Sequence, residues 1–330
     1  MVRDMSSSTF VFVSSRRGPT MGRVERRMLR VMTALIEGGV HVNLICTPRS
    51  QIETAARELG VEVAPYHLDR LNYYRTRSRV KKYLQRQGAA IVHSTGLEGD
   101  LIARWAAREL PAKAVDSLTC MDWPRNGPTA LSRVVRRYLD GSSIEDADAI
   151  VVDCHNLGER LVGEGVPRER IVYDPPSVDI AEMLEQAAWP WAPPERPAGP
   201  LVGYGGRIEA ARGLETLVAA SAILDARGAL AEVVIAGEGP LLRELRENAR
   251  SSRVRYLGYV ESVPAVLAKL AIAVYPSTGP GVPTSLLEAA ALGRPIVASR
   301  GEGIDGLFVD GHELVLVPPG APKAPALAVA

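Results

Sequence analysis

The sequence lacks the features that define several common classes of protein. It has only three cysteines, Cys46, Cys120 and Cys154, and no CxxC pair, so it predicts neither a disulfide framework nor a zinc site. All of its uninterrupted apolar runs are much shorter than the roughly 18 residues that a membrane span requires. The N-terminal apolar run at 10–13 is too short for a signal peptide. We therefore expect a cytoplasmic protein without a metal ion.

A strong net charge is also absent. The chain has 39 Lys and Arg against 38 Asp and Glu, whereas a protein that binds nucleic acid is normally far more basic. We therefore expect no nucleic-acid partner. The balance hides an asymmetry, because residues 1–90 alone carry 16 basic and 7 acidic side chains. This concentration of positive charge near the N-terminus requires an explanation.

The length and the hydrophobic pattern indicate two α/β domains. A chain of 330 residues has room for two cores, and its short apolar runs alternate with amphipathic stretches of ten residues or more. This alternation is typical of parallel sheets covered by helices on both faces. The expected strands are 9–14, 40–46, 61–64, 89–93, 113–117, 149–153, 170–173, 201–204, 232–236, 254–257, 271–275 and 295–298.

Proline interrupts the alternation once, at 189–200, where five of twelve residues are proline. Such a segment continues neither a helix nor a central strand and is typical of a linker. We expect an N-terminal domain at 1–180, a linker at 181–200 and a C-terminal domain at 201–330. The predicted fold is two Rossmann-like, doubly wound parallel-sheet domains that face a central cleft, where ligands would bind at the strands' carboxyl ends.

A glycine-rich loop follows the first strand of the C-terminal domain. It runs from Gly205 to Gly213, contains Arg207 and Arg212, and leads into a helix whose free N–H groups would point at a ligand. Two guanidinium groups in that place suit a diphosphate. The spacing differs from the dinucleotide motif GxGxxG, because Ile208 takes the last position. A plain strand-to-helix connection with surface arginines is the alternative interpretation.

Two further loops of this kind occur in the same domain. One is Gly237-Glu238-Gly239-Pro240, and the other, at 279–283, leads into a helix that carries Ser285 and Glu288. Because Ser285 and Glu288 have the spacing of a capping box, Glu288 has a structural interpretation. The functional one is a carboxylate that accepts hydrogen bonds from a nucleotide's ribose. Three loops at strand carboxyl ends converge on one crevice, which favours a binding site.

These motifs resemble those of the family 4 retaining glycosyltransferases of the GT-B fold. That family has GR, a short spacer and KG, then GxGP, then a glycine-rich loop that ends in LLEAMAxGxPVVA. The C-terminal half matches with Gly206-Arg207, Arg212-Gly213, the GEGP loop and the segment at 286–298. In the N-terminal half, the segments similar to the family's GGxER, GHxV and PNGVD motifs are 22–26, 39–42 and 175–179.

The resemblance implies a retaining glycosyltransferase that moves a sugar from a nucleoside-diphosphate sugar to a cell-envelope, polysaccharide or lipid-linked acceptor. It implies that Arg207 and Arg212 clamp the diphosphate and that Glu288 holds the ribose, and it makes these three the catalytic set. The nucleotide sugar is a substrate, so no cofactor is expected. The donor-binding residues that it implies are Gly22, Gly206, Arg207, Arg212, Gly237, Gly239, Pro240, Thr284, Ser285 and Glu288.

Two other functions remain open. A catalytically degenerate relative would bind a nucleotide sugar or a partner without turnover; Pro280 suggests it, because many family members have a second glutamate there, and Arg23 replaces a glycine. The chain also stops at Ala330, where the family usually continues, so we expect the usual final helices to be missing. The third hypothesis is a nucleotide-sugar epimerase on the same twin-domain fold.

Three other patterns have a structural and a functional interpretation. The basic stretch at 75–86 is a solvated helix face or, with Val80, Tyr83 and Leu84 as an apolar strip, a surface that rests on anionic lipid at the inner face of the plasma membrane. The DxD pattern of Asp146 and Asp148 is more typical of a strand start than of a metal site. A packed or solvated His93 is likewise favoured over a cleft residue.

Overall fold

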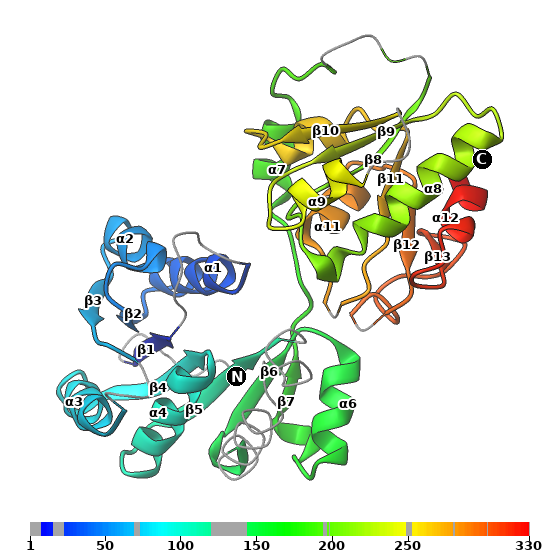
Figure 1. The fold of residues 1–330 in the computed structure, drawn as a ribbon. Helices are drawn as coiled ribbons and strands as arrows, with labels where there is room; N and C mark the ends of the chain where they lie inside the picture. The colour runs from blue at the N-terminus through cyan, green and yellow to red at the C-terminus, as the bar shows by residue number, and fades with distance from the viewer. Residues whose placement is uncertain are drawn as a thin grey trace. The chain divides into compact units, whose positions relative to one another are not determined.

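The computed structural model describes residues 8–15, 23–68, 73–119, 144–193, 197, 199–248, 253–279, 281–301 and 303–329. The chain divides into two compact units (Figure 1). Unit 1 comprises Met1–Asp153 and Leu157–Asp174, and unit 2 comprises Cys154–Asn156 and Pro175–Ala330. Each unit contains its own parallel sheet, as the alternating sequence pattern predicts.

Unit 1 is built on a seven-stranded sheet in the order β3-β2-β1-β4-β5-β6-β7, and its paired strands are parallel. The strand order reverses between β1 and β4, which is the topological switch point of a doubly wound sheet. The strands are β1 (Thr9–Ser14), β2 (His41–Cys46), β3 (Glu62–Pro65), β4 (Ala89–Thr95), β5 (Lys113–Leu118), β6 (Ala149–Val152) and β7 (Ile171–Tyr173).

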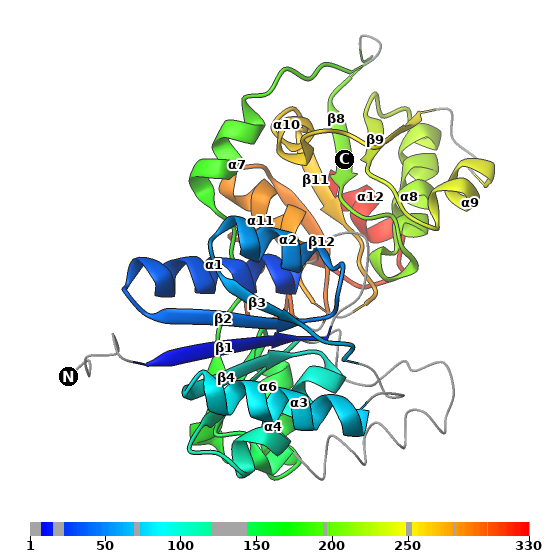
Figure 2. The same cartoon turned by 90° about the vertical axis from the view of Figure 1, so that its left-hand side faces the viewer.

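Helices cover both faces of this sheet (Figure 2). Side chains of β1 alternate between the faces, so Phe12 packs with Met32 under one helix layer and Val13 packs with Ile102 under the other. The first layer holds α1 (Arg23–Glu37) and α2 (Gln51–Glu58), and the second holds α3 (Tyr73–Arg86) and α4 (Leu97–Arg108). Helix α6 (His155–Gly163) connects β6 to β7.

Unit 2 is built on a six-stranded sheet in the order β10-β9-β8-β11-β12-β13. All its strand pairs are parallel, and the order reverses between β8 and β11. The inner strands β9 and β12 are buried along their whole length and mostly apolar, because helices cover both faces of the sheet. The strands are β8 (Leu201–Gly205), β9 (Glu232–Ala236), β10 (Val254–Gly258), β11 (Ile272–Tyr275), β12 (Ile296–Ser299) and β13 (Val315–Val317).

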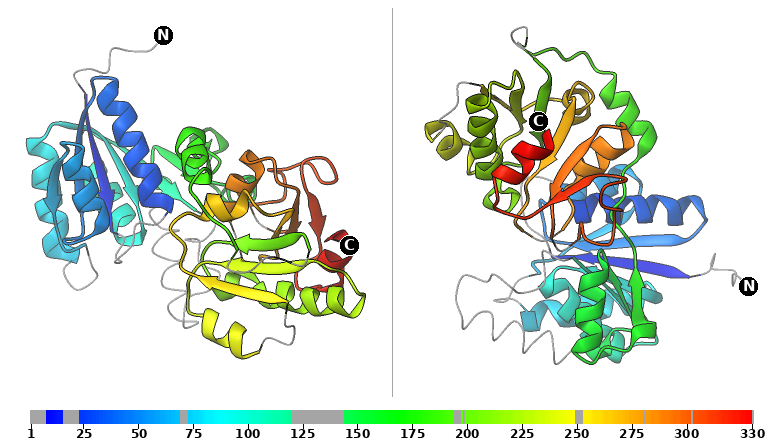
Figure 3. Two further views of the ribbon diagram at one scale, coloured as in Figure 1. Left: turned by 90° about the horizontal axis from the view of Figure 1, so that it is seen from above. Right: turned by 90° about the vertical axis from the view of Figure 1, so that its right-hand side faces the viewer.

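The helices of unit 2 form two layers around one core (Figures 1 and 3). Helices α8 (Leu214–Ala226) and α9 (Leu242–Glu247) lie on one face, and α10 (Val263–Leu267) and α11 (Thr284–Ala291) lie on the other. Helix α12 (Lys323–Val329) packs on α8, where Ala326 meets Leu224 in a small apolar cluster.

The division between the units differs from the sequence-based expectation. The long segment of unit 2 begins at Pro175, whereas the sequence pattern predicts a first domain up to residue 180 and a linker at 181–200. Part of that stretch is the helix α7 (Ile180–Ala187), which Asp179 caps by accepting a hydrogen bond from the N–H of Glu182 at 3.0 Å. The carbonyl of Gln186 accepts a hydrogen bond from Ser262 of unit 2 at 2.7 Å.

Three other expectations have outcomes at this level. Cys154 forms a disulfide bond, whereas the number and spacing of the cysteines predict no disulfide framework. Cys46 is a buried free thiol, and burial raises its pKa to about 11. In the described part of the chain, every helix is too short or too polar to cross a bilayer. The helix expected near 129–140 lies outside the described residues.

Candidate functional site

Three loops of unit 2 meet where the strand order of its sheet reverses. They follow the carboxyl ends of β8, β9 and β11, and the first and third lead directly into α8 and α11. Ligands of doubly wound sheets bind at this place, because the loops on the two sides of the reversal diverge to opposite faces and leave a crevice. The expected convergence of the three loops in one region is therefore confirmed.

The loops after β8 and β9 are in direct backbone contact. The N–H of Ile208 donates to the carbonyl of Glu238 at 2.8 Å. A Cβ atom at Gly237 would lie 1.8 Å from the carbonyl oxygen of Gly206, and one at Gly239 would lie 2.0 Å from that of Ile208. Both glycines also have positive φ angles, of 128° and 159°. Only glycine allows the two loops to approach so closely.

The loop after β11 is held to the loop after β8 in the same way. The N–H groups of Thr278 and Gly279 donate to the carbonyl of Ala211 at 3.1 and 3.0 Å. A Cβ atom at Gly213, which has a φ angle of 60°, would lie 2.1 Å from the carbonyl oxygen of Pro276. The β8 loop therefore connects the other two, and the three form one backbone framework.

Two buried tyrosines donate hydrogen bonds to the backbone of this framework. The hydroxyl of Tyr204 donates to the carbonyl of Arg207 at 2.9 Å, and that of Tyr275 donates to the carbonyl of Ser285 at 2.6 Å. Their rings pack edge to face at 5.6 Å. Burial raises the pKa of both phenols, so both stay protonated and act as hydrogen-bond donors. A Cβ atom at Gly206 would lie 3.1 Å from Ser285 Oγ, which places the first turn of α11 against the β8 loop.

The start of α11 corrects one interpretation of Glu288. The residue that caps this helix is Pro283, and no described side chain accepts a hydrogen bond there. Ser285 therefore lies inside the first turn, and the capping-box interpretation of Ser285 and Glu288 is wrong. Glu288 lies in the second turn, partly buried, where its charge contributes to the raised pKa of Tyr275.

The basic groups of the site differ in exposure. The Arg207 side chain is 76% exposed, whereas that of Arg212 is only 11% exposed. Both lie within ion-pair distance of Glu209, at 3.3 and 3.2 Å. A guanidinium group at the surface can reach a ligand by rotation of its own side chain, while the buried one has a fixed position. The loop thus combines one fixed and one adjustable positive charge.

The residues predicted to bind the donor are gathered in this framework, with one exception. Gly22 lies outside the described residues. The contacts above place the others on the three loops or on α11, and their role in binding stays a prediction. These residues are Gly206, Arg207, Arg212, Gly237, Gly239, Pro240, Thr284, Ser285 and Glu288.

Glu209, Tyr204 and Tyr275 are not among the site residues predicted from the sequence. The two tyrosines stand at corresponding positions near the ends of apolar strands, where a polar tip among apolar residues is a signal for a buried hydrogen bond. Glu209 stands two residues after one arginine and three before the other, and this spacing could have predicted its ion pairs.

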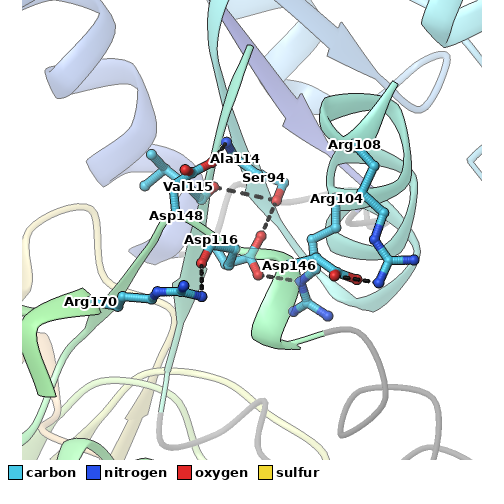
Figure 4. A network of polar contacts seen from close by, with 10 residues as sticks. Ser94, Arg104, Arg108, Ala114, Val115, Asp116, Asp146, Asp148 and Arg170 are labelled. Carbon is cyan, nitrogen blue, oxygen red and sulfur yellow. Dashed lines mark hydrogen bonds and ion pairs between the residues drawn. The ribbon is translucent and has the colours of Figure 1, made fainter. Parts of the chain in front are cut away.

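In unit 1, the DxD pattern has a structural role (Figure 4). Asp148 accepts hydrogen bonds from the N–H of Ala114 at 2.9 Å and from Lys113 Nζ at 2.6 Å. Asp146 forms an ion pair with Arg108 of α4. The two carboxylates therefore attach the start of β6 to β5 and α4, as the structural interpretation predicts. Among the described residues, no three metal-ligating side chains form a group.

A buried ion pair lies next to this network. Arg104 of α4 pairs with Asp116 of β5, and the two side chains are 1% and 0% exposed. Ser94 donates to the other oxygen of Asp116 at 2.9 Å (Figure 4). Burial raises the pKa of Asp116, while the Arg104 guanidinium and the Ser94 hydroxyl favour its charged form. The pair connects β4, β5 and α4 in the interior of unit 1.

The basic helix α3 corrects the apolar-strip interpretation. Val80 and Leu84 are buried in the core of unit 1, and Tyr83 packs beside them, so this strip faces the sheet and not a membrane. Arg77 lies over the ring of Trp105 at 4.6 Å, which turns it toward α4. Four basic side chains point outward and form the basic stripe of α3. They are Arg75, Arg79, Lys82 and Arg86.

Two family models match the chain. The model described as Glycosyl transferase 4-like domain matches residues 22–176. The model described as Glycosyl transferases group 1 matches residues 199–330, which include the three loops. The matched ranges correspond to the two α/β units and together span nearly the whole chain.

The individual proteins that resemble this chain match it over part of its length or at low sequence identity. An alpha-D-kanosaminyltransferase of Streptomyces kanamyceticus is 35% identical over 126 residues, which are 36% of this chain and 33% of that protein. The chain thus matches about a third of that relative's length. The lipopolysaccharide core biosynthesis glycosyltransferase LpsE of Rhizobium meliloti is 25% identical over 306 residues, which are 90% of this chain and 81% of that protein.

A solved structure shows the same fold. HepE of Anabaena, in complex with UDP, superposes with a TM-score of 0.77 over 97% of this chain and 88% of that one, at 15% sequence identity. This likeness establishes the GT-B fold, in which each of the two units is Rossmann-like. With the family models matched to both units, the chain belongs to the group 1, or family 4, glycosyltransferases.

Proposed function

We propose that the protein is a retaining glycosyltransferase that transfers a sugar from a nucleoside-diphosphate sugar to a cell-envelope, polysaccharide or lipid-linked acceptor, without a metal ion. The observation that carries the proposal is the framework of three glycine loops, with Arg207 and Arg212 on one loop and the N-terminus of α11 beside it. Backbone N–H groups, a helix N-terminus and guanidinium groups are what an anionic diphosphate binds.

Departure of a nucleoside diphosphate is the step that this arrangement would favour. Negative charge grows on the leaving phosphate as the bond to the sugar breaks, and Arg207 and Arg212 would stabilise it there. The leaving phosphate could then accept the proton of the acceptor hydroxyl, so that no side-chain base is required. Glu288, in the second turn of α11, would accept hydrogen bonds from the ribose and orient the nucleotide.

The acceptor class rests on the relatives. LpsE is named for lipopolysaccharide core biosynthesis, and it aligns with 90% of this chain. An acceptor of that kind is an envelope glycan or is carried by a lipid. We therefore place an envelope glycan or a lipid-linked saccharide at the acceptor side of the proposed reaction.

The basic stripe of α3 supports a location at an anionic membrane surface. Arg75, Arg79, Lys82 and Arg86 follow one another at helical spacings of four, three and four residues, so they lie along one face. All four are exposed, and each Lys or Arg near anionic lipid contributes about 1 kcal/mol. A lipid-linked acceptor would be presented at such a surface. We therefore propose peripheral binding through charge, without insertion of apolar side chains.

A panel of nucleoside-diphosphate sugars tests the proposed activity. The full chain is incubated with UDP-, GDP-, ADP- and TDP-sugars, with and without lipid-linked acceptors, and release of nucleotide diphosphate is measured together with the product. Release that depends on the acceptor, with retained anomeric configuration, is the expected result. Tight binding without release would favour the degenerate relative instead, and an epimerised free nucleotide sugar would favour an epimerase.

A further inference from the structure

We infer that Glu209 is a counter-ion of the donor site, whose carboxylate competes with the diphosphate for Arg207 and Arg212 and so limits how tightly the nucleotide product is held. The inference rests on the proposed function, because it takes the two arginines as the diphosphate site. It adds to that site a residue of opposite charge, which works against binding and in favour of release.

The geometry places one carboxylate between the two guanidinium groups. Oε2 of Glu209 lies 3.3 Å from Nη2 of Arg207, and Oε1 lies 3.2 Å from Nη2 of Arg212. Each oxygen therefore faces a different arginine. A phosphate group that bound both arginines would approach the same N–H groups and would meet the negative charge of Glu209 beside them.

The carboxylate is poorly satisfied where it lies. Its side chain is 19% exposed, and Oε1 is buried yet accepts no hydrogen bond from any described residue. The contact with Arg212 is thus an ion pair without the alignment of a hydrogen bond. A buried oxygen without a hydrogen bond is costly, so exchange of this contact for a phosphate contact requires little free energy.

A purely local structural role does not explain this position. Glu209 precedes the single 3-10 turn Ala210–Arg212 with extended backbone angles, and its side chain makes no capping hydrogen bond there. The turn is closed by the backbone instead, because the N–H of Arg212 donates to the carbonyl of Glu209 at 2.9 Å. The side chain can therefore change without loss of the turn.

The consequence for binding follows from charge. With Glu209 ionised, the cluster carries one net positive charge instead of two. Removal of the carboxylate should raise the affinity for a diphosphate, slow its dissociation, and do so most at low ionic strength, where charges are least screened. For an enzyme that must release a nucleoside diphosphate in each cycle, the carboxylate would increase the rate of product release.

The test is the affinity of the full chain and of Glu209→Gln for inorganic pyrophosphate, measured by titration calorimetry at low and high salt. Glutamine keeps the size of the side chain and removes its charge. We expect binding about 10-fold tighter in Glu209→Gln at low salt, with a smaller difference at high salt. Glu215→Gln is the matched control, because Glu215 is exposed on α8 and forms no ion pair with a described residue.

The outcomes separate this inference from the proposed function. Equal or weaker binding by Glu209→Gln, with an unchanged melting temperature, would overturn the role of Glu209. An equal gain in Glu215→Gln would also overturn it, because the effect would then be one of general charge. Arg212→Ala tests the site itself: wild-type affinity in that variant, or no binding by any variant, would overturn the diphosphate site and the inference with it.

Discussion

The backbones of Gly237 and Gly206 are in such close contact that the loops after β9 and β8 cannot move independently. The position of a Cβ atom on Gly237 is 1.8 Å from the carbonyl oxygen of Gly206, well inside van der Waals contact. The loops after β8 and β9 therefore form a single rigid backbone framework. The peptide groups that would face a diphosphate are fixed before any ligand binds.

Substitution of Gly237 by alanine should separate these two loops. Gly237→Ala combines a clash with the backbone of Gly206 and a φ angle of 128°. We expect the free energy of unfolding to fall by about 3 kcal/mol and nucleotide binding to be lost. Gly228→Ala is the control, because Gly228 also has a positive φ, of 74°, but nothing within 4 Å of the Cβ position. It should cost about 1 kcal/mol and leave binding intact. Equal melting temperatures for the two variants would contradict this account.

The buried pair of Arg104 and Asp116 should stabilise unit 1 only as a pair. Arg104→Met leaves the Asp116 carboxylate buried without the guanidinium group of its ion pair. We expect the free energy of unfolding to fall by about 3–5 kcal/mol. The double variant Arg104→Met with Asp116→Leu should be less damaged than the single one, because no unpaired charge remains. Calorimetric melting of the three proteins provides the comparison. A single variant within about 1 kcal/mol of wild type would show that the pair matters little.

The architecture could be predicted largely from the sequence because parallel strands and their helices leave separate hydrophobic periods. The strands Thr9–Ser14 and Glu232–Ala236 have the bounds that the sequence pattern predicts. The helix α7 was missed because its neighbourhood is dominated by proline at 189–200, which is typical of a linker. The short strand Val315–Val317 was missed because three residues carry too little periodicity.

The site was predictable in its residues but less so in its interactions. Glycine, arginine and helix-start signals marked the loops at Gly206, Gly237 and Thr284, because each signal is local. The capping-box interpretation of Glu288 failed because the helix begins after Pro283, and helix starts are poorly fixed by sequence. The ion pairs of Glu209 depend on side-chain directions that only the folded loop defines.

His93 should make unit 1 less stable at acidic pH. Its Nε2 lies 2.7 Å from Ser117 Oγ, its ring packs against Phe12, and burial, with a contribution from the charge of Arg27, lowers its pKa from 6.5 to about 4. The unfolded chain therefore binds a proton first. Stability should fall as the pH drops from 6.5 toward 4, by up to about 3 kcal/mol.

Comparison with His93→Gln isolates that effect from the titration of carboxylates. The difference in unfolding free energy between wild type and His93→Gln should shrink as the pH falls through this range, because only the wild type has to bury a neutral imidazole. Denaturant titrations at several pH values measure it. Parallel curves for the two proteins would mean that His93 titrates normally.

Removal of the basic stripe of α3 should weaken binding to anionic membranes. Replacement of all four side chains by glutamine should lower the membrane affinity measured by liposome flotation by roughly 1,000-fold, because each charge contributes about 1 kcal/mol. The fold should persist, because these side chains point away from the core. The control replaces four exposed basic residues of unit 2, namely Arg227, Arg243, Lys269 and Lys323.

Vesicles of neutral lipid complete that experiment. Charge-driven binding requires anionic lipid and decreases with salt. If wild type floats equally well with neutral vesicles, or if the unit 2 control loses as much binding as the stripe variant, the basic stripe is not the membrane surface.

The most direct test of the account is the affinity for nucleoside diphosphates of the wild type, Arg207→Ala and Arg212→Ala. Calorimetric titration with UDP, GDP, ADP and TDP identifies the nucleotide, and the same titration is then made with each variant. We predict that both substitutions weaken binding markedly and abolish sugar transfer, Arg212→Ala more strongly because its side chain is the more buried and fixed. Unchanged nucleotide affinity in both variants would contradict the diphosphate site on which the proposed function depends.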